Sequence, residues 1–316
     1  MVTLRSWSRA DLAAMAGLIN ARVAAEGDFD EPVTLAAITA VYDHLGSCDP
    51  ARDIVVATDP DGTVSGYART VRNDMADGTR NYALAFEGEG AVGARMLDWA
   101  IARATELAAA DPHPRQQLDA GAADGTARAR AIGAAGGFVP YAWSATMVRP
   151  TLAEVPDLSL PAGVMVREVD EGDLRAIWEA DVEAFRDHNH ELAEVGDDEW
   201  QQFLVEADEG TEWWQVAWDA DGVVGQVRTR VVPGEAERLG RRRAWTENIS
   251  TRRERRQQGI ASSLIAASLR QLDAAGFDEA ALGVDLGNPT GALAVYERLG
   301  YQVVQRHTGY HRPLDT

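Results

Sequence analysis

The pattern of apolar and polar positions in the second half of the chain predicts short strands that alternate with amphipathic helices. An opening strand is expected over 164–169, followed by a helix that begins at Asp173. A short helical stretch near 198–207 precedes two strands, which the Asp-Gly turn ending at Gly222 joins as a hairpin. These two strands are expected over 215–218 and 223–229.

A second group of predicted elements closes this half. A strand over 245–251 leads into a helix for which Gly276 is a suitable end. The apolar face of this helix is formed by Ile260, Leu264, Ile265, Leu269 and Leu272. A strand over 280–284, a helix from Asn288 and a strand over 301–305 follow, and the Asn288-Pro289 pair favours a helix start. The pattern as a whole predicts a mixed α/β fold.

The first half repeats features of the second at a nearly constant distance, which is the signature of a duplicated unit. Leu4-Arg5 with Asp11-Leu12 recurs as Val166-Arg167 with Asp173-Leu174, at an offset of 162. The turn Asp59–Gly62 recurs as Asp219–Gly222 at an offset of 160, and Gly137-Phe138 recurs as Gly300-Tyr301 at an offset of 163. We therefore expect two copies of one fold, over residues 1–150 and 164–316, joined by a linker over 151–163 that holds two prolines and a terminal glycine.

Composition narrows the possible chemistry. The 316 residues are 46% hydrophobic and 25% charged, which suits two ordinary globular domains. The sequence contains no lysine, which excludes Schiff-base catalysis and phosphate loops that depend on a lysine. The single cysteine, Cys48, excludes disulfide frameworks and cysteine-rich metal centres. No metal site is expected.

The net charge of −20 argues against binding to nucleic acid or to an anionic membrane. The start of the sequence lacks an apolar signal core, and no stretch approaches 18 apolar residues. We therefore expect a cytoplasmic protein, either a monomer or a homodimer.

One segment departs from this acidic background. Residues 238–256 carry eight arginines and two glutamates, a local charge of +6 that leaves −26 for the rest. The segment ends in Arg256-Gln257-Gln258-Gly259-Ile260-Ala261, where a strand is predicted to turn into a helix. Glycine and the free N–H groups of a first helical turn can bind a phosphate. A solvated basic loop and a plain strand–helix turn remain alternatives.

The Arg-x-x-Gly-x-Ala sequence at this junction resembles the acetyl-CoA pyrophosphate loop of the GNAT superfamily of N-acetyltransferases. A second mark of that family, an Asn followed by a helix with Ala and Tyr that ends in Gly-aromatic, is similar to residues 288–301. The close resemblance covers about 245–301, and the order of strands extends it over 164–316. It implies an α/β fold with a mixed sheet and two tandem GNAT acyltransferase domains, an arrangement similar to that of the mycothiol synthases.

The resemblance also implies roles for individual residues. The backbone of Ile249 and Thr251 would bind the pantetheine arm of the cosubstrate acetyl-CoA, and Asn288 would approach it from the neighbouring helix. Tyr296 would protonate the departing thiolate, because a tyrosine remains a proton donor at neutral pH. The pyrophosphate would lie on the segment Arg256, Gln257, Gln258, Gly259, Ile260, Ala261 and Ser262.

An amine nucleophile needs a base, and the resemblance implies Glu247 for that role. By simple strand alternation its side chain shares the face of Ile249. Glu247 could instead be a structural partner of the arginines, and Glu235 and Glu237 are then reserve bases. The resemblance places Asp187, His188 and His190 at the acceptor substrate, with a solvated loop or a metal as alternatives. Trp213, Trp214 and Trp218 are expected to cap the pocket or to pack in the core.

The first half departs from the family pattern. The segment 86–93 keeps its glycines, but Glu87 and Glu89 would repel a pyrophosphate. Tyr296 corresponds to Gly133 at an offset of 163, so the general acid is missing. This half is expected to be a degenerate copy that serves the structure or part of the acceptor site, and it could still hold CoA.

The sequence therefore predicts a tandem protein whose C-terminal domain transfers acetyl from acetyl-CoA directly to the primary amine of a small molecule. Two alternatives stay open. The acceptor could be that of a mycothiol synthase, or the chain could be a non-catalytic acyl-CoA-binding or regulatory protein.

Overall fold

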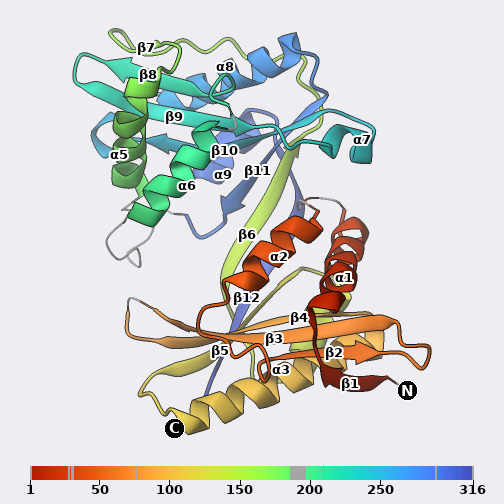
Figure 1. Ribbon diagram of the computed structural model, residues 1–316. Coiled ribbons are helices and arrows are strands. Elements are labelled where there is room, and N and C mark those ends of the chain that lie inside the picture. Colours follow the sequence, from red (N-terminus) through yellow and green to blue (C-terminus); the bar gives the residue numbers. More distant parts are fainter. Residues whose placement is uncertain are drawn as a thin grey trace. The chain divides into compact units, whose positions relative to one another are not determined.

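The computed structural model describes residues 2–27, 29, 32–75, 77–185, 197–208, 210–288 and 290–314. Contacts divide the chain into two compact units, which are coloured from red to blue along the sequence in Figure 1. The N-terminal unit comprises Met1–Ser144 with Gln305–Thr316, and the C-terminal unit comprises Ala145–Val304.

The N-terminal unit is a sheet with helices on both faces. Its elements are β1 (Thr3–Ser6), α1 (Leu12–Ala25), α2 (Leu35–Asp43), β2 (Ile54–Thr58), β3 (Val64–Asp74), β4 (Arg80–Gly88), α3 (Gly90–Ala110), β5 (Gln116–Ala123), α4 (Ala127–Ala135) and the start of β6 (Val139–Arg149). The strands lie in the order β1-β2-β3-β4-β5. Among these five strands, β4 and β5 run parallel to each other and the other neighbouring pairs are antiparallel. β5 pairs on its other side with β12 (Gln302–Pro313) in antiparallel register.

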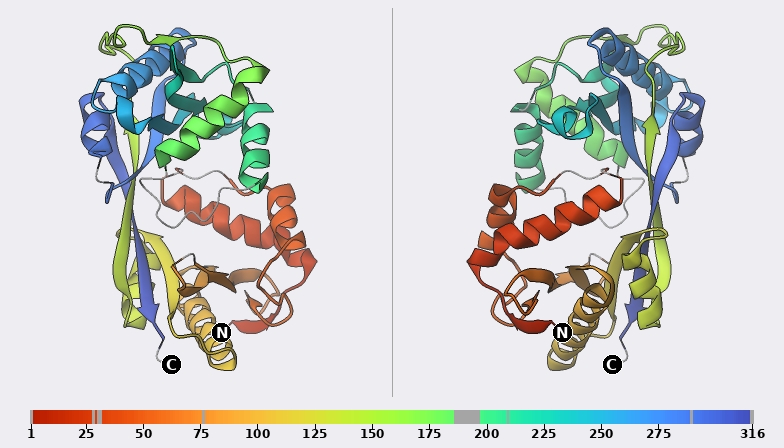
Figure 2. Two further views of the ribbon diagram at one scale, coloured as in Figure 1. Left: turned by 90° about the vertical axis from the view of Figure 1, so that its left-hand side faces the viewer. Right: turned by 90° about the vertical axis from the view of Figure 1, so that its right-hand side faces the viewer.

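The two faces of this sheet are built by alternation along the strands. Ile54 and Val56 point into the core formed with α1 and α2, whereas Val55 and Ala57 point into the core formed with α3. Figure 2 shows α3 on one face of these strands and α1 on the other. Each face thus buries its own row of aliphatic side chains.

The C-terminal unit repeats this order of elements. It contains β7 (Met165–Val166), α5 (Leu174–Phe185), α6 (Asp197–Asp208), β8 (Gln215–Asp219), β9 (Gly222–Arg230), the additional short α7 (Glu235–Leu239), β10 (Arg243–Thr251), α8 (Ile260–Ala274), β11 (Glu279–Asp285) and α9 (Ala292–Arg298). The strand order is β7-β8-β9-β10-β11, followed by β6. Val216 packs with α5 and α6, and the adjacent Ala217 packs with α8. The predicted duplication of a mixed α/β fold is confirmed.

Strands β6 and β12 each have residues in both units. The division by contacts therefore differs from the boundaries expected from sequence, because it assigns Gln305–Thr316 to the N-terminal unit. The cause is the antiparallel pairing of His307–Pro313 with β5. The boundaries 1–150 and 164–316, with a linker over 151–163, stay a prediction.

The segment 151–163 forms neither helix nor strand, yet it packs on the C-terminal unit. Leu152 is buried in the core that also contains α8. The Ser263 Oγ donates to the Ser159 carbonyl at 3.0 Å, and the Arg270 guanidinium donates to the Pro156 carbonyl at 2.8 Å. This connection is therefore part of the folded unit. Across the described residues, none of the helices has the length and apolar character that crossing a membrane requires.

Candidate functional site

A large cavity of the C-terminal unit opens where two parallel strands separate. β10 and β11 pair only over Arg243–Trp245 and Glu279–Ala281. Beyond these residues the strands part, and a cavity of about 1110 Å³ lies between them and α8 and α9. Ligand pockets usually measure roughly 300–1,000 Å³, so this one has room for a large ligand.

A β-bulge shapes the β10 wall of the cavity. Glu247 pairs with Arg228 and Ser250 pairs with Gln226, so two residues of β10 stand opposite the single residue 227. Asn248 lies at the bulge with a φ of 46°, a left-handed conformation that asparagine tolerates better than most residues. The bulge interrupts the regular alternation of side chains along β10.

The bulge separates two residues that simple alternation places together. Ile249 packs into the core that contains Leu264 of α8. Glu247 lies on the opposite face, where its carboxylate accepts a hydrogen bond of 3.3 Å from Arg230 Nε. The expectation that Glu247 shares the face of Ile249 is therefore wrong, because the inserted residue shifts the register by one. Both residues still line the cavity, from opposite faces of the strand.

The junction between β10 and α8 forms an open loop. Gln257 and Gly259 both adopt left-handed conformations, with φ values of 60° and 82°, and helix α8 begins at Ile260. The residues Gln257, Gly259, Ile260, Ala261 and Ser262 line the cavity. The side chain of Gln258 is exposed and donates to the Glu254 carbonyl, outside the group of described residues that line the cavity. The N–H groups of the first turn of α8 are thus next to the cavity, where they suit an anion.

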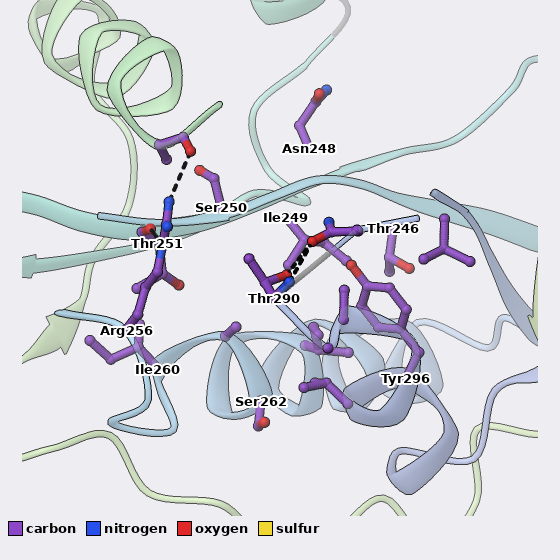
Figure 3. A pocket seen from close by; sticks show the side chains of 18 of the residues that line it. Thr246, Asn248, Ile249, Ser250, Thr251, Arg256, Ile260, Ser262, Thr290 and Tyr296 are labelled. Atoms are coloured by element: carbon purple, nitrogen blue, oxygen red, sulfur yellow. Dashed lines mark hydrogen bonds between the residues drawn. The ribbon is translucent and has the colours of Figure 1, made fainter. Parts of the chain in front are cut away.

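Arg256 shapes this loop through backbone contacts. Its Nε donates to the Thr251 carbonyl at 3.1 Å, and its Nη2 donates to the Ala184 carbonyl at 2.9 Å. Figure 3 shows the second of these bonds as a dashed line. The guanidinium therefore ties the end of β10 to the end of α5, in addition to lining the cavity.

The arginine-rich segment is divided in two by the strand it contains. Nine residues of β10, at about 3.3 Å each, separate the arginines at its start from those at its end by roughly 30 Å. At the start, Arg241 and Arg243 each donate to Glu279 at 2.7 Å. At the end, Arg255 pairs with Asp219 at 2.9 Å. Of this segment, only the arginines of 252–256 lie near the loop. The positive electrostatic potential at the loop is therefore weaker than the net charge of +6 for residues 238–256 indicates.

Tyr296 of α9 reaches the cavity from the side opposite the bulge. Figure 3 shows its hydroxyl pointing toward the part of β10 that carries Thr246 and Ile249. The side chain is buried, and this burial raises its pKa to about 12. Its ring stands edge-on to Tyr301 with centroids 6.2 Å apart. Tyr296 therefore holds a proton next to the cavity at neutral pH.

Asn288 also lines the cavity, but it does not begin a helix. Its Oδ1 accepts from the backbone N–H of Thr290 at 2.9 Å and from the Thr290 hydroxyl at 2.6 Å. Gly291 follows with a φ of 74°, which interrupts a right-handed helix, and α9 starts at Ala292. The predicted helix start at Asn288 is therefore wrong: the asparagine closes a local turn instead.

On the α5 and α6 face, Glu247 adjoins a polar cluster that sequence reasoning missed. Arg228 donates to Asp181 of α5 at 2.8 Å and to Glu206 of α6 at 3.1 Å. The Asn248 amide at the bulge donates to the other Glu206 oxygen at 3.4 Å. Burial raises the pKa of both Asp181 and Glu206. The polar residues Gln226, Arg228 and Arg230, alternating along a buried strand, were the one sequence signal for this cluster.

Other expected site residues lie elsewhere. Asp187, His188 and His190 fall outside the described residues. Glu235 is buried and accepts from Trp245 Nε1 at 3.2 Å, so it has a structural role, and Glu237 is exposed.

The tryptophans considered as pocket caps pack elsewhere: Trp213 on Phe277, Trp214 on Phe203 and Trp218 under Arg167. Within the described part of the chain, no group of three or more His, Cys, Asp or Glu could hold a metal ion.

Comparisons with known proteins agree with this architecture. Residues 174–301 match the model of the acetyltransferase (GNAT) family. The chain is similar to a GCN5-related N-acetyltransferase from Sphaerobacter thermophilus, with a TM-score of 0.72 and 22% identity over 99% of this chain and 95% of that one. It is also similar to a tandem GNAT protein from the clavulanic acid biosynthesis pathway, with a TM-score of 0.66 and 14% identity over 100% and 99% of the two chains. No curated protein sequence matches it.

Proposed function

We propose that this chain is an N-acetyltransferase, since residues 174–301 match the acetyltransferase (GNAT) family model and the whole chain is similar in fold to a tandem GNAT protein. Its C-terminal unit transfers acetyl from acetyl-CoA to the primary amine of a small molecule. The observation that carries this proposal is the cavity between the parted strands β10 and β11. This cavity extends from the first turn of α8 to the Tyr296 side chain.

The residues around the cavity suit CoA. Backbone N–H groups of Gln257–Ser262 would bind the pyrophosphate, since an unpaired first helical turn favours negative charge. The backbone of Ile249 and Thr251, next to the bulge, would bind the pantetheine arm. Asn288 would contact the cosubstrate from the loop before α9. The left-handed φ values of Gln257 and Gly259 support this assignment, because they orient the loop that borders the cavity.

Acetyl-CoA supplies an activated acyl group, and two side chains would move the protons. Glu247 takes a proton from the ammonium form of the acceptor, so that the nitrogen lone pair can attack the thioester carbonyl. Tyr296 donates its hydroxyl proton to the sulfur when the C–S bond breaks. The attacking nitrogen loses its second proton to solvent as the amide forms, and Tyr296 regains a proton from solvent. The products are an amide and free CoA thiol, so no acyl-enzyme is needed. Because Glu247 and Ile249 lie on opposite faces of β10, the amine and the cosubstrate would reach the carbonyl from opposite faces.

The compartment and the acceptor belong to the same proposal. One cysteine in the whole sequence suits a reducing compartment, and we place the reaction in the cytoplasm. The polar cluster of Asp181, Glu206 and Arg228 beside Glu247 supports a polar acceptor.

Replacing Tyr296 by Phe tests the proposal directly. Removal of a general acid typically costs 10²- to 10⁴-fold, so thiol release from acetyl-CoA with a panel of primary amines should fall by about that factor. The thermal shift produced by CoA should be unchanged, because the Tyr296 hydroxyl is not among the groups proposed to bind the pyrophosphate. Thiol release at the wild-type rate would remove Tyr296 from this role. A thermal shift with CoA but no turnover with any amine would favour a non-catalytic acyl-CoA-binding protein.

A further inference from the structure

The N-terminal unit contains the counterpart of the strand separation that forms the cavity. β4 and β5 pair in parallel over Arg80–Ala83 and Gln116–Asp119, and then they part. Ala83 and Asp119 each precede their C-terminal counterparts, Trp245 and Ala281, by 162 residues. The same fork between two strands is therefore present in both halves.

At this second strand separation, the loop that would surround a pyrophosphate is missing. A single residue, Glu89, connects the end of β4 to the start of α3, whereas residues 252–259 connect β10 to α8. The chain closes so tightly that a Cβ on Gly93 would lie 2.3 Å from the Gly88 carbonyl oxygen. From Arg80 to Gly88 every residue of β4 pairs with β3 in unbroken register, without the bulge found in β10. This geometry leaves no loop to surround a pyrophosphate.

The fork itself is bridged by an arginine from the first turn of α4. Arg128 Nε donates to the Gly121 carbonyl of β5 at 2.7 Å, and its Nη1 donates to the Phe86 carbonyl of β4. The guanidinium carbon lies 3.8 Å from the centroid of the Phe86 ring, as in a cation–π contact. One planar group thus satisfies a backbone acceptor on each of the two parting strands.

The comparison with the C-terminal unit shows what this arginine replaces. At an offset of 163, Phe86 corresponds to Ile249, whose backbone is proposed to bind pantetheine. At the same offset Arg128 corresponds to Gly291, which lines the large cavity and has no atom within 4 Å of where a Cβ would stand. The position that is open in one unit is filled by a guanidinium in the other.

We propose that Arg128 is a built-in plug that occupies the pantetheine position of the N-terminal unit, so that this unit binds no CoA. Glu87 of β4 and Glu89, the residue that follows this strand, carry negative charge that would also disfavour a bound anion. Burial and the hydrogen bond of 3.0 Å from Arg22 fix Glu87 in place. The whole chain should then bind one molecule of CoA. This expected stoichiometry rests on the CoA site proposed for the C-terminal unit.

The stoichiometry of CoA binding tests the plug. Isothermal titration of the full chain with CoA should give one site per chain. Ala261→Asp places a carboxylate in the first turn of α8, and Ser262→Asp is a second variant of the same kind. Both should reduce binding at least a hundredfold and leave no remaining site. Two sites in the wild type, or one intact site in both variants, would overturn the plug. No binding to the wild type would instead overturn the proposed function.

A second experiment tests the plug without CoA. Arg128→Ala should accelerate amide hydrogen exchange in β4 and β5 next to Phe86 and Gly121 by about tenfold, because hydrogen bonds from a charged donor are lost. The control is Arg130→Ala, since Arg130 lies two residues further on α4 and its exposed guanidinium donates to the nearby Gly125 carbonyl. Equal exchange in the two variants would contradict a bridging role for Arg128.

Discussion

An arginine and an aspartate occupy equivalent positions in the two halves, and the structure explains why. Arg5 donates to both carboxylate oxygens of Asp11 at 2.8 and 2.7 Å, and Arg167 binds Asp173 in the same bidentate manner. Asp11 also accepts from the Ser8 backbone at 2.7 Å. The pair fixes the joint between the first strand and the first helix of each unit. The sequence match that indicates the repeat is therefore a structural motif.

This motif predicts a pH dependence of stability. The Arg5 hydrogen bond is the main cause that lowers the pKa of Asp11 from 3.8 to about 2. A carboxyl whose pKa is lower in the folded state contributes stability above its unfolded pKa and loses it as the pH falls. Asp11→Asn should therefore cost about 1–2 kcal/mol at pH 7 and progressively less from pH 4 to pH 2. Urea unfolding between pH 2 and 7 measures this, and a pH-independent cost would contradict it.

Glu247 carries a second prediction at this scale. If it removes the proton of the amine, Glu247→Gln should lower kcat by about 10²- to 10⁴-fold and leave the KM for acetyl-CoA unchanged. Its carboxylate is 35% exposed and bound to Arg230, so the loss of that contact should hardly change the melting temperature. The control is Glu237→Gln, an exposed residue of α7, which should retain full activity. A loss of stability with kcat intact would instead identify Glu247 as a structural ion-pair partner.

At the scale of elements, the bulge in β10 determines the shape of the site. It places Ile249 toward α8 and Glu247 toward α5 and α6, and the strand leaves β11 after Trp245. The residue that makes the bulge possible is Asn248, because most other non-glycine residues would be strained at its φ of 46°.

Substitutions at Asn248 can separate this backbone effect from the loss of the side chain. Both Asn248→Gly and Asn248→Val remove the hydrogen bond to Glu206. Only valine, which is β-branched, strains the left-handed conformation. Asn248→Val should therefore be less stable than Asn248→Gly by about 1–3 kcal/mol and should bind CoA more weakly. Thermal melting with and without CoA measures both effects, and equal behaviour of the two variants would show that the bulge does not depend on this residue.

Most elements of the C-terminal unit follow from the sequence because their apolar positions recur with the period of a helix or a strand. The predicted helix with Ile260, Leu264 and Leu272 is α8, and the predicted hairpin is β8 and β9. The bulge was not predictable, since nothing in local periodicity distinguishes Asn248 from a regular strand residue. The same holds for the contacts of Arg228 with Asp181 and Glu206, which join residues far apart in the sequence.

The pairing of the last strand also escaped prediction. Residues 301–305 were expected as a short strand, but β12 extends to Pro313 and joins β5 of the other half. Its side chains are mostly half-buried or exposed, so hydrophobic periodicity gives a weak signal. Pairing between distant strands depends on backbone hydrogen bonds, which a sequence pattern does not reveal.

At the scale of the whole molecule, we expect the stabilities of the two units to be coupled, because β6 and β12 each have residues in both. If one unit unfolded, β6 and β12 would lose their pairing there, and both strands also belong to the other unit. Unfolding should therefore occur in a single calorimetric transition. CoA adds a sharper test, since a ligand at 100 times its Kd stabilises the folded state by about 2.7 kcal/mol. If the units are coupled, this binding should move the entire transition to higher temperature, although only the C-terminal unit is proposed to hold CoA. Two transitions, of which CoA moves one, would mean that the halves unfold independently in spite of the strands they share.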